Sequence, residues 1–339
     1  MKIRSLFNGK DSRPYIIAEM ANAHNGDKKI AKAIVLSAAK AGADAVKFQF
    51  FTPDELAVPS YSSYELYKRL QMPESSWREL FKLAKKRGLE VLVDVFGLQS
   101  AKMAVKLGTD GFKIHNADIN SLKLIQYVAG TKKPVILSCG GSLPEEISNA
   151  ISTIRKMKNR NIMLMFGIQS YPTDISDSFL GKIKLFIKKF DVPVGFASHL
   201  EGGKPESIAA PSWAVIAGAS AVEVHITIDR SQKLPDYYSS LEPDEFSKMA
   251  LLVRDVHLAM QGDSLKLSKK ELDYRLRHKK FLVASKDIRK NESLTESNTA
   301  LKRINNPSEN SVTSMMYILG KRSKRALSLN SPISKEDIK

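Results

Sequence analysis

Short apolar runs and longer amphipathic stretches alternate along the first 260 residues of the chain. The apolar runs are rich in Val, Ile and Phe, as buried parallel strands are, and the stretches between them have helical spacing. The predicted strands cover residues 15–20, 45–50, 90–95, 111–114, 134–137, 162–166, 194–196 and 221–226. The predicted helices cover residues 28–41, 75–87, 100–107, 121–129, 144–156, 177–188, 207–217 and 242–259. About eight strand–helix units in this length predict an α/β fold, a (β/α)8 TIM barrel.

The alternation stops after residue 260. Residues 261–280 are polar and strongly charged, which predicts a linker with a helix around residues 269–277. From residue 281 onward, short strand-like runs are separated by turns rich in Ser, Asn and Pro. We therefore expect a barrel domain at 1–260, a linker at 261–280 and a small β-rich domain at 281–339.

The composition is that of a globular protein, with 339 residues of which 43% are hydrophobic and 26% charged. This balance excludes collagen-like, coiled-coil and wholly disordered classes. No run approaches the roughly 20 apolar residues that span a bilayer, and the first ten residues lack the apolar region of a secretory signal. Cys139 is the single cysteine, which fits a reducing compartment. We expect a cytoplasmic protein.

The chain is basic, with a formal net charge of +17. Residues 265–339 hold 18 Lys and Arg against 8 Asp and Glu, so much of the excess lies there. A basic excess suits nucleic acid, a membrane surface or small anions. The chain has no aromatic RNA-binding motif, no zinc-finger spacing and no long basic tract. We therefore expect small anionic substrates and neither a nucleic-acid nor a membrane partner.

The predicted strands end in residues that are able to do chemistry, and barrel enzymes place their active sites at these ends. The candidates, in chain order, are Glu19, Lys47, Gln49, Asp94, Lys113, Asn116, Asp118, Ser138, Gln169, Tyr171, His199, Glu223 and His225. This agreement across nearly all the strands indicates an active site at that end of the barrel.

Lys47 and Lys113 lie within apolar runs, where an unpaired charge is costly to bury. One interpretation is that both point into the barrel and bind the phosphate or carboxylate of an anionic substrate. The alternative is that both extend along the surface to reach solvent. Their matching positions in two strands favour the first interpretation.

His199 follows one predicted strand, and His225 lies near the end of the next one, where Glu223 shares a strand face with it. Two imidazoles with open positions suit a divalent metal that polarises a carbonyl. The alternative is that each histidine is an ordinary polar loop or core residue. Glu19 ends the first strand, where it is either a base that holds a water molecule or a cap for nearby backbone amides.

Several segments together resemble the sialic (nonulosonic) acid synthases, across essentially the whole chain and in the same order. These segments are IIAE (16–19), ADAVKFQ (43–49), GFKI (111–114), PVILS (134–138), SYPT (170–173), VGFASH (194–199), EVHIT (223–227) and SLEPDEF (240–246). The segment FLVASKDI (281–288) is similar to the start of the antifreeze-like (SAF) domain that follows the barrel in that family.

The resemblance implies a function: condensation of phosphoenolpyruvate (PEP) with an N-acetylated hexosamine aldehyde similar to N-acetylmannosamine. The products are a nonulosonic (sialic-type) acid and phosphate. A divalent metal, Mn²⁺ or Mg²⁺, and a domain-swapped homodimer are implied as well. A related enzyme with another sugar acceptor, or a sugar-binding homologue with impaired catalysis, is the alternative.

The resemblance also implies roles for single residues. Glu19 and Glu223 would be catalytic, and His199 and His225 would hold the metal. The implied PEP-binding residues are Lys47, Lys113, Asn116, Ser138, Gln169 and Ala197. The implied sugar-binding residues are Gln49, Asp118, Tyr171, Asp236 and Arg303, the last supplied by the SAF domain of the other protomer.

Some positions depart from the family pattern. Asp94 stands where the family has a hydroxyl residue that contacts phosphate, and a carboxylate there repels phosphate unless it is paired. Asn116, Gln169, Ala197 and Ser198 also replace the usual residues. Several of the implied PEP contacts are thus changed, and these changes suggest a divergent member with a different sugar or a reduced activity.

Overall fold

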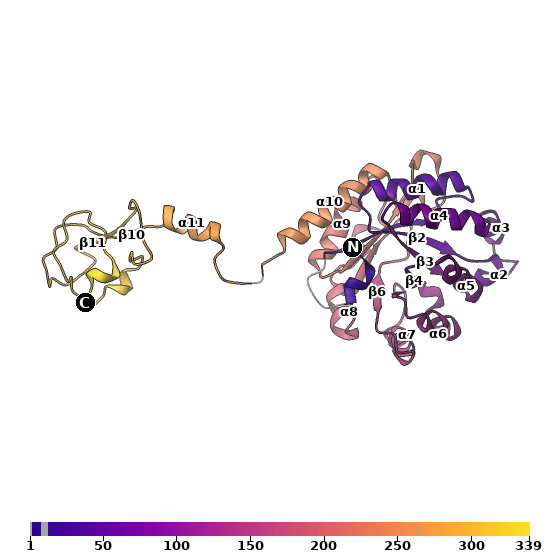
Figure 1. The fold of residues 1–339 in the computed structure, drawn as a ribbon, viewed down its shortest axis with the longest axis horizontal. Coiled ribbons are helices and arrows are strands. Elements are labelled where there is room, and N and C mark those ends of the chain that lie inside the picture. The colour runs from indigo at the N-terminus through magenta and orange to yellow at the C-terminus, as the bar shows by residue number, and fades with distance from the viewer. Residues whose placement is uncertain (1, 8–12, 263) are drawn as a thin grey trace. The chain divides into compact units, whose positions relative to one another are not determined.

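The computed structural model describes residues 2–7, 13–262 and 264–339. The chain forms two compact units, Met1–Gln261 and Gly262–Lys339, which are described separately (Figure 1). Among the described residues, no helix has both the length and the apolar character needed to cross a membrane.

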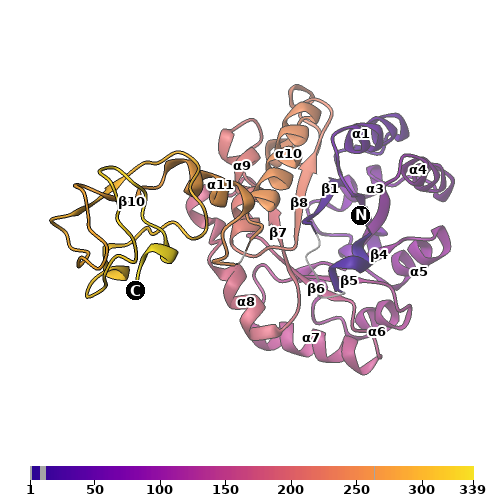
Figure 2. The same ribbon diagram turned by 60° about the vertical axis from the view of Figure 1, so that its left-hand side comes forward.

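The first unit is a closed barrel of parallel strands. The strands are hydrogen-bonded in chain order from β1 to β8, and β1 also pairs with β8, which closes the ring (Figure 2). The bounds are β1 (Tyr15–Ala21), β2 (Ala45–Phe50), β3 (Glu90–Val95), β4 (Gly111–Ile114), β5 (Val135–Ser138), β6 (Ile162–Phe166), β7 (Val194–Ser198) and β8 (Ala221–Ile226). A two-residue strand, β9 (Ser240–Leu241), adds to β8. The predicted (β/α)8 barrel is confirmed.

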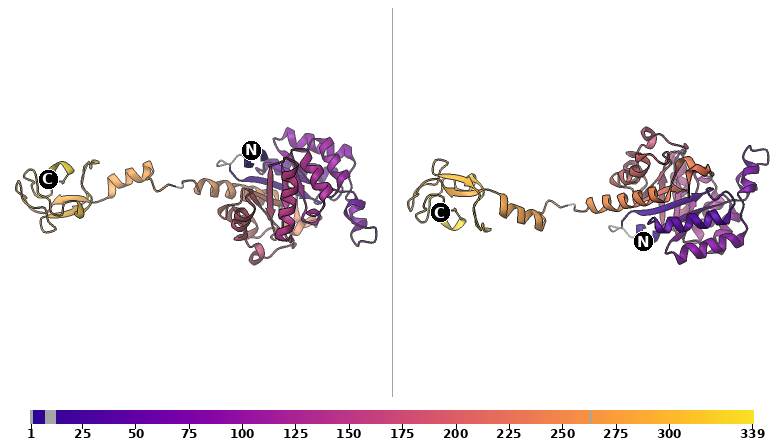
Figure 3. Two further views of the ribbon diagram at one scale, coloured as in Figure 1. Left: turned by 90° about the horizontal axis from the view of Figure 1, so that it is seen from below. Right: turned by 90° about the horizontal axis from the view of Figure 1, so that it is seen from above.

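Helices lie alongside the strands and surround the ring (Figure 3). They are α1 (Lys28–Lys40), α4 (Glu74–Lys86), α5 (Leu98–Leu107), α6 (Leu122–Gly130), α7 (Pro144–Lys156), α8 (Lys182–Phe190), α9 (Pro205–Ile216) and α10 (Pro243–Ala259). Two short helices, α2 (Pro53–Leu56) and α3 (Tyr64–Arg69), lie in the segment between β2 and α4. The helix predicted at 177–188 is partly wrong. A 3₁₀ turn at Ile175–Ser178 precedes Phe179, whose φ of 41° interrupts the helical path, so α8 begins only at Lys182.

The barrel has two apolar layers. The larger one lies between the strands and the helices. The smaller one lies in the barrel interior and includes Ile17 of β1, Leu92 of β3 and Met165 of β6. A 3₁₀ turn at Ile3–Phe7 adds Ile3 and Leu6 to this inner layer. Strand residues two apart share a face, so Glu19 follows Ile17 and Asp94 follows Leu92 on the inner side of the barrel. These buried polar residues form a second, polar layer in the interior.

The second unit begins with α11 (Lys269–His278), close to the helix predicted in the linker. Strands β10 (Phe281–Ala284) and β11 (Thr299–Lys302) form an antiparallel pair. The rest is mostly turns joined by isolated bridges, such as Ile288 with Leu327. Among its described residues, nine buried apolar side chains, including those of Leu282 and Ile318, form its own core.

Candidate active site

The polar layer of the barrel interior contains most of the strand-end residues singled out by sequence. Glu19 on β1 is in register with Lys47 on β2 and with His225 on β8. Asp94 on β3 is in register with Lys113 on β4. Residues in register on parallel strands face the same side of the sheet, so these side chains all point into the barrel. Neither lysine extends to solvent, since Lys47 is 1% and Lys113 3% exposed.

Two lysines and three carboxylates form one buried charged cluster, made of Glu19, Lys47, Asp94, Lys113 and Glu223. Lys47 Nζ forms an ion pair with Glu19 and lies 3.3 Å from Asp94 Oδ2 and 3.4 Å from Glu223 Oε1. Lys113 Nζ lies 2.6 Å from Glu223 Oε1 and 3.9 Å from Asp94 Oδ2. All five side chains are at most 4% exposed. We call this group the charged cluster.

Burial raises the pKa of the glutamates of the charged cluster, and pairing with lysine lowers it. Burial raises the pKa of Glu19 to about 7, although Lys47 opposes the shift and Glu223 adds to it. For Glu223, burial also favours the neutral acid, but Lys113 and Lys47 outweigh it and lower the pKa to about 2. Glu19 Oε1 accepts a hydrogen bond from the Ala21 amide at 2.7 Å. Glu19 therefore caps the backbone, as one interpretation held, and also pairs with a lysine.

His199 and His225 lie beside the charged cluster, with ring centroids 5.4 Å apart. The Tyr171 ring packs against both imidazoles, at 4.6 Å from His199 and 6.2 Å from His225. Burial lowers the pKa of each histidine to about 3, so both rings are neutral at neutral pH. Both are therefore available as ligands rather than as cations.

The two imidazoles fit a divalent metal. His199 Nδ1 lies 2.7 Å from the carbonyl oxygen of Ile168. A carbonyl only accepts, so Nδ1 carries the proton and Nε2 keeps a lone pair. His225 Nδ1 is buried without a hydrogen-bond partner among the described residues. Within the same residues, no group of three His, Cys, Asp or Glu side chains is placed to hold a metal. Two protein ligands leave the other positions to water and substrate.

A chain of hydrogen bonds joins two of the candidate sugar-binding residues. The Asn22 amide N–H donates to Asp236 Oδ2 at 3.3 Å, and Asn22 Nδ2 donates to Gln49 Oε1 at 3.3 Å. Asn22 Oδ1 is buried and has no partner among the described residues. Asn22 is not among the residues predicted from sequence, although it begins the turn that follows Glu19 and the end of β1. Tyr171, a third candidate, donates to the side chain of Gln169.

The remaining PEP candidates lie on and after β4 to β7. Asn116 Nδ2 donates to the Gly140 carbonyl at 2.7 Å. Gly140 is necessary there, because a Cβ at this position would lie 1.9 Å from the Gly167 oxygen. This close backbone approach brings together the loops after β5 and β6. Ser138 ends β5 and is 1% exposed, and Ala197 on β7 is part of the apolar barrel interior.

Two candidates stand apart from these groups. Asp118 lies in a 3₁₀ turn after β4, and burial, with smaller contributions from Asp94 and Glu55, raises its pKa to about 6. Arg303 belongs to the second unit, where its exposed side chain donates to the His278 carbonyl at 3.3 Å.

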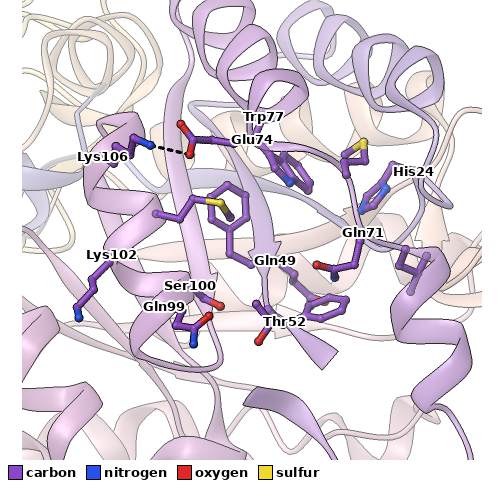
Figure 4. A pocket seen from close by; sticks show the side chains of 15 residues that line it. His24, Gln49, Thr52, Gln71, Glu74, Trp77, Gln99, Ser100, Lys102 and Lys106 are labelled. Carbon is purple, nitrogen blue, oxygen red and sulfur yellow. Dashed lines mark hydrogen bonds and ion pairs between the residues drawn. The ribbon is translucent and has the colours of Figure 1, made fainter. Parts of the chain in front are cut away.

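A cavity of about 350 Å³ lies next to Gln49, between the loop after β2 and helices α4 and α5. His24 and Gln71 lie on one side of it, and Lys102 and Lys106 of α5 lie on the other (Figure 4). Trp77 and other apolar side chains contribute to its wall, and Lys106 pairs with Glu74 at 2.8 Å. The cavity therefore has both polar and apolar surface beside a candidate sugar-binding residue.

Comparisons with known proteins agree with this architecture. Residues 34–265 match the NeuB family, and residues 279–339 match the SAF domain. The chain is 31% identical to the pseudaminic acid synthase of Helicobacter pylori, over 96% of this chain and 98% of that protein. It is 30% identical to the N,N'-diacetyllegionaminic acid synthase of Legionella pneumophila, over 87% and 86%.

A solved structure shows the same fold. The N-acetylneuraminic acid (sialic acid) synthetase of Leptospira borgpetersenii, determined in complex with citrate, superposes with a TM-score of 0.73 at 28% identity. The match covers 78% of this chain and 92% of that one. The chain therefore belongs to the NeuB family of sialic-type acid synthases, with a SAF domain after its barrel.

Proposed function

We propose that this protein condenses phosphoenolpyruvate with the open-chain aldehyde of an N-acetylated hexosamine similar to N-acetylmannosamine. The products are a nonulosonic acid and inorganic phosphate. The observation that carries the proposal is the charged cluster next to two neutral imidazoles at the ends of the barrel strands. Relatives named as pseudaminic and legionaminic acid synthases support the same class of reaction.

Lys47 and Lys113 bind the donor in this proposal. PEP carries a phosphate and a carboxylate, which repel each other, and two ammonium groups offset that repulsion through charge-assisted hydrogen bonds. The Nζ atoms of both lysines lie within 3.5 Å of Glu223 Oε1, so they are close enough to act on one small molecule. Ser138, Asn116, Gln169 and Ala197 complete the donor pocket.

The reaction forms one carbon–carbon bond, and at C2 it replaces the bond to the phosphate's bridging oxygen with a bond to the oxygen of water. C3 of PEP attacks the aldehyde carbon, so positive charge develops at C2 and negative charge develops at the aldehyde oxygen. The oxygen of a water molecule adds to C2, and its two protons pass to the former aldehyde oxygen and to the phosphate. The bond from C2 to the bridging oxygen then breaks, so that phosphate leaves with that oxygen and the 2-keto acid is formed. Glu19, with help from Glu223, orients the sugar or the attacking water and stabilises the positive charge at C2.

The acceptor sugar binds beside the two histidines. Asp236 and Gln49, linked through Asn22, together with Asp118 and Tyr171, contact its hydroxyl groups. The unpartnered Asn22 Oδ1 supports this placement, because a sugar hydroxyl supplies the missing donor. Arg303 of the other protomer in a domain-swapped homodimer completes the site. A bound Mn²⁺ or Mg²⁺, held by His199 and His225, would polarise the aldehyde oxygen.

The direct test is phosphate release from PEP in the presence of Mn²⁺ and a panel of N-acetylated hexosamines. We expect phosphate to appear only when both PEP and a suitable sugar are present, at one equivalent for each keto acid formed. Folded protein that releases no phosphate with any sugar contradicts the proposal. If that protein still binds sugars but not PEP, it is a sugar-binding homologue. Turnover with only a different aldose identifies the alternative acceptor.

A further inference from the structure

The charged cluster contains one more carboxylate than lysine among the described residues. Lys47 and Lys113 supply two positive charges, and Glu19, Asp94 and Glu223 supply up to three negative charges. All five side chains are buried, so bulk water screens these charges only weakly. In the protein without substrate, the two ammonium groups are therefore fully neutralised. An incoming phosphate therefore meets no unpaired ammonium group in the charged cluster.

Asp94 differs from the other two carboxylates in how it is held. Glu19 is anchored to the Ala21 amide, and Glu223 lies 2.6 Å from Lys113. Asp94 is 0% exposed, and among the described residues Lys47 gives it its hydrogen bond, at 3.3 Å, with Lys113 farther away at 3.9 Å. Its second oxygen, Oδ1, has no hydrogen-bond partner in that part of the chain. The two lysines thus provide its close charged contacts.

We propose that Asp94 is an internal counter-ion that competes with the substrate phosphate for Lys47 and Lys113 and so lowers the affinity for PEP. This inference rests on the proposed function, since it concerns the donor of that reaction. A phosphate that binds both lysines has to come within a few ångströms of the Asp94 carboxylate. Like charges at such distances in a buried site strongly disfavour binding.

The arrangement also explains why a carboxylate is tolerated at this position. Asp94 is paired with two buried ammonium groups, so its charge is compensated inside the barrel, and it gives both lysines a further partner when no substrate is bound. The same contact that stabilises the protein without substrate is therefore the one that phosphate has to displace. A residue with only a structural role would leave PEP affinity unchanged or lower it when replaced. If Asp94 is a counter-ion, removal of its charge raises the affinity for PEP.

The test measures the binding of PEP and of inorganic phosphate to the full chain by titration calorimetry. The variants are Asp94→Asn, which keeps the shape and removes the charge, and Asp94→Thr, which supplies a hydroxyl. Asp255→Asn is the control, because it removes the same charge from an exposed position on α10. Thermal unfolding confirms that each variant is folded. We expect Asp94→Asn to bind PEP and phosphate about tenfold more tightly or better, with the KM for the sugar unchanged, and Asp255→Asn to bind like the natural protein.

The outcomes separate this inference from the proposed function. Equal or weaker binding of both ligands by the folded Asp94 variants overturns the role of Asp94, whether or not the enzyme turns over. Tighter phosphate binding by the variants, with no turnover by any of the proteins, supports the counter-ion and contradicts the proposed reaction. If Asp94→Asn does not fold, the PEP and phosphate affinities of Asp94→Thr, which also lacks the charge, test the role of Asp94 in its place.

Discussion

At the scale of single residues, the barrel interior buries charges that are stable only together. The residue types were predictable, because Lys47, Lys113 and Glu19 stand out within apolar strands. Their partners were not, since the pairing depends on strand register, which the sequence does not fix. Asp94 is the clearest case: it lies in register with Lys113 and within 3.3 Å of Lys47, which is 47 residues away along the chain.

We expect Lys113→Met to lower the free energy of unfolding by about 3 kcal/mol, because it leaves Glu223 buried beside fewer positive charges. Urea denaturation measures this change. Lys204→Met is the control, since Lys204 pairs with Glu201 at the surface, where such pairs contribute less than about 1 kcal/mol. Equal effects of the two substitutions would contradict the importance of the buried pair.

Replacement of His225 tests the proposed metal site. We expect His225→Ala to lose Mn²⁺ binding, because a single remaining imidazole holds the ion too weakly, and to lose turnover with it. Electron paramagnetic resonance of free Mn²⁺ gives the bound fraction directly. His257→Ala, on α10, removes a histidine that contacts Gln261 and is expected to leave binding unchanged. Unaltered Mn²⁺ binding by His225→Ala would rule out this residue as a ligand.

At the scale of elements, the hydrophobic pattern predicted the barrel well. The bounds of β2, β3, β4, β6 and β8 agree with the predicted ranges. The pattern failed where local backbone geometry sets the start of a helix. The positive φ of Phe179 interrupts the helix predicted at 177–188. The pattern also missed α2, whose start has a signal: the Thr52 side chain caps the helix and Pro53 occupies its first position.

The 3₁₀ turn at Ile3–Phe7 is expected to act on stability and not on chemistry. Ile3 is 1% exposed within the inner apolar layer, and its amide donates to Glu90 at 2.6 Å. Ile3→Ala should therefore lower the free energy of unfolding by about 2 kcal/mol or more and leave the KM for PEP unchanged. Leu185→Ala, at an exposed site on α8, should change stability by less than about 0.5 kcal/mol. A raised KM in the Ile3 variant would instead connect this turn with substrate binding.

At the scale of the whole molecule, the chain consists of a barrel and a small second unit with its own core. The sequence indicated this division through the loss of the β/α alternation after residue 260. The role of the second unit was not predictable from its composition, because its candidate residue, Arg303, is one of many exposed basic side chains there. The proposed role rests on a swapped homodimer, in which each active site needs residues from two protomers.

Complementation between two inactive variants tests whether each active site contains residues from both protomers. Arg303→Ala and His225→Ala should each be inactive as purified proteins. After unfolding and refolding together, half of the dimers are mixed, and each mixed dimer contains one intact site, so about a quarter of the natural activity should return. No recovery, with mixed dimers confirmed by native mass spectrometry, would show that Arg303 does not act across the dimer.

The central claim, a carbon–carbon bond between PEP and an amino sugar, is tested most directly by mass spectrometry of the product made from PEP labelled with carbon-13 at all three carbons. The account predicts one acid whose mass is that of the sugar plus a fully labelled pyruvate unit. Labelled pyruvate released as a free product, with the sugar unchanged, would contradict it.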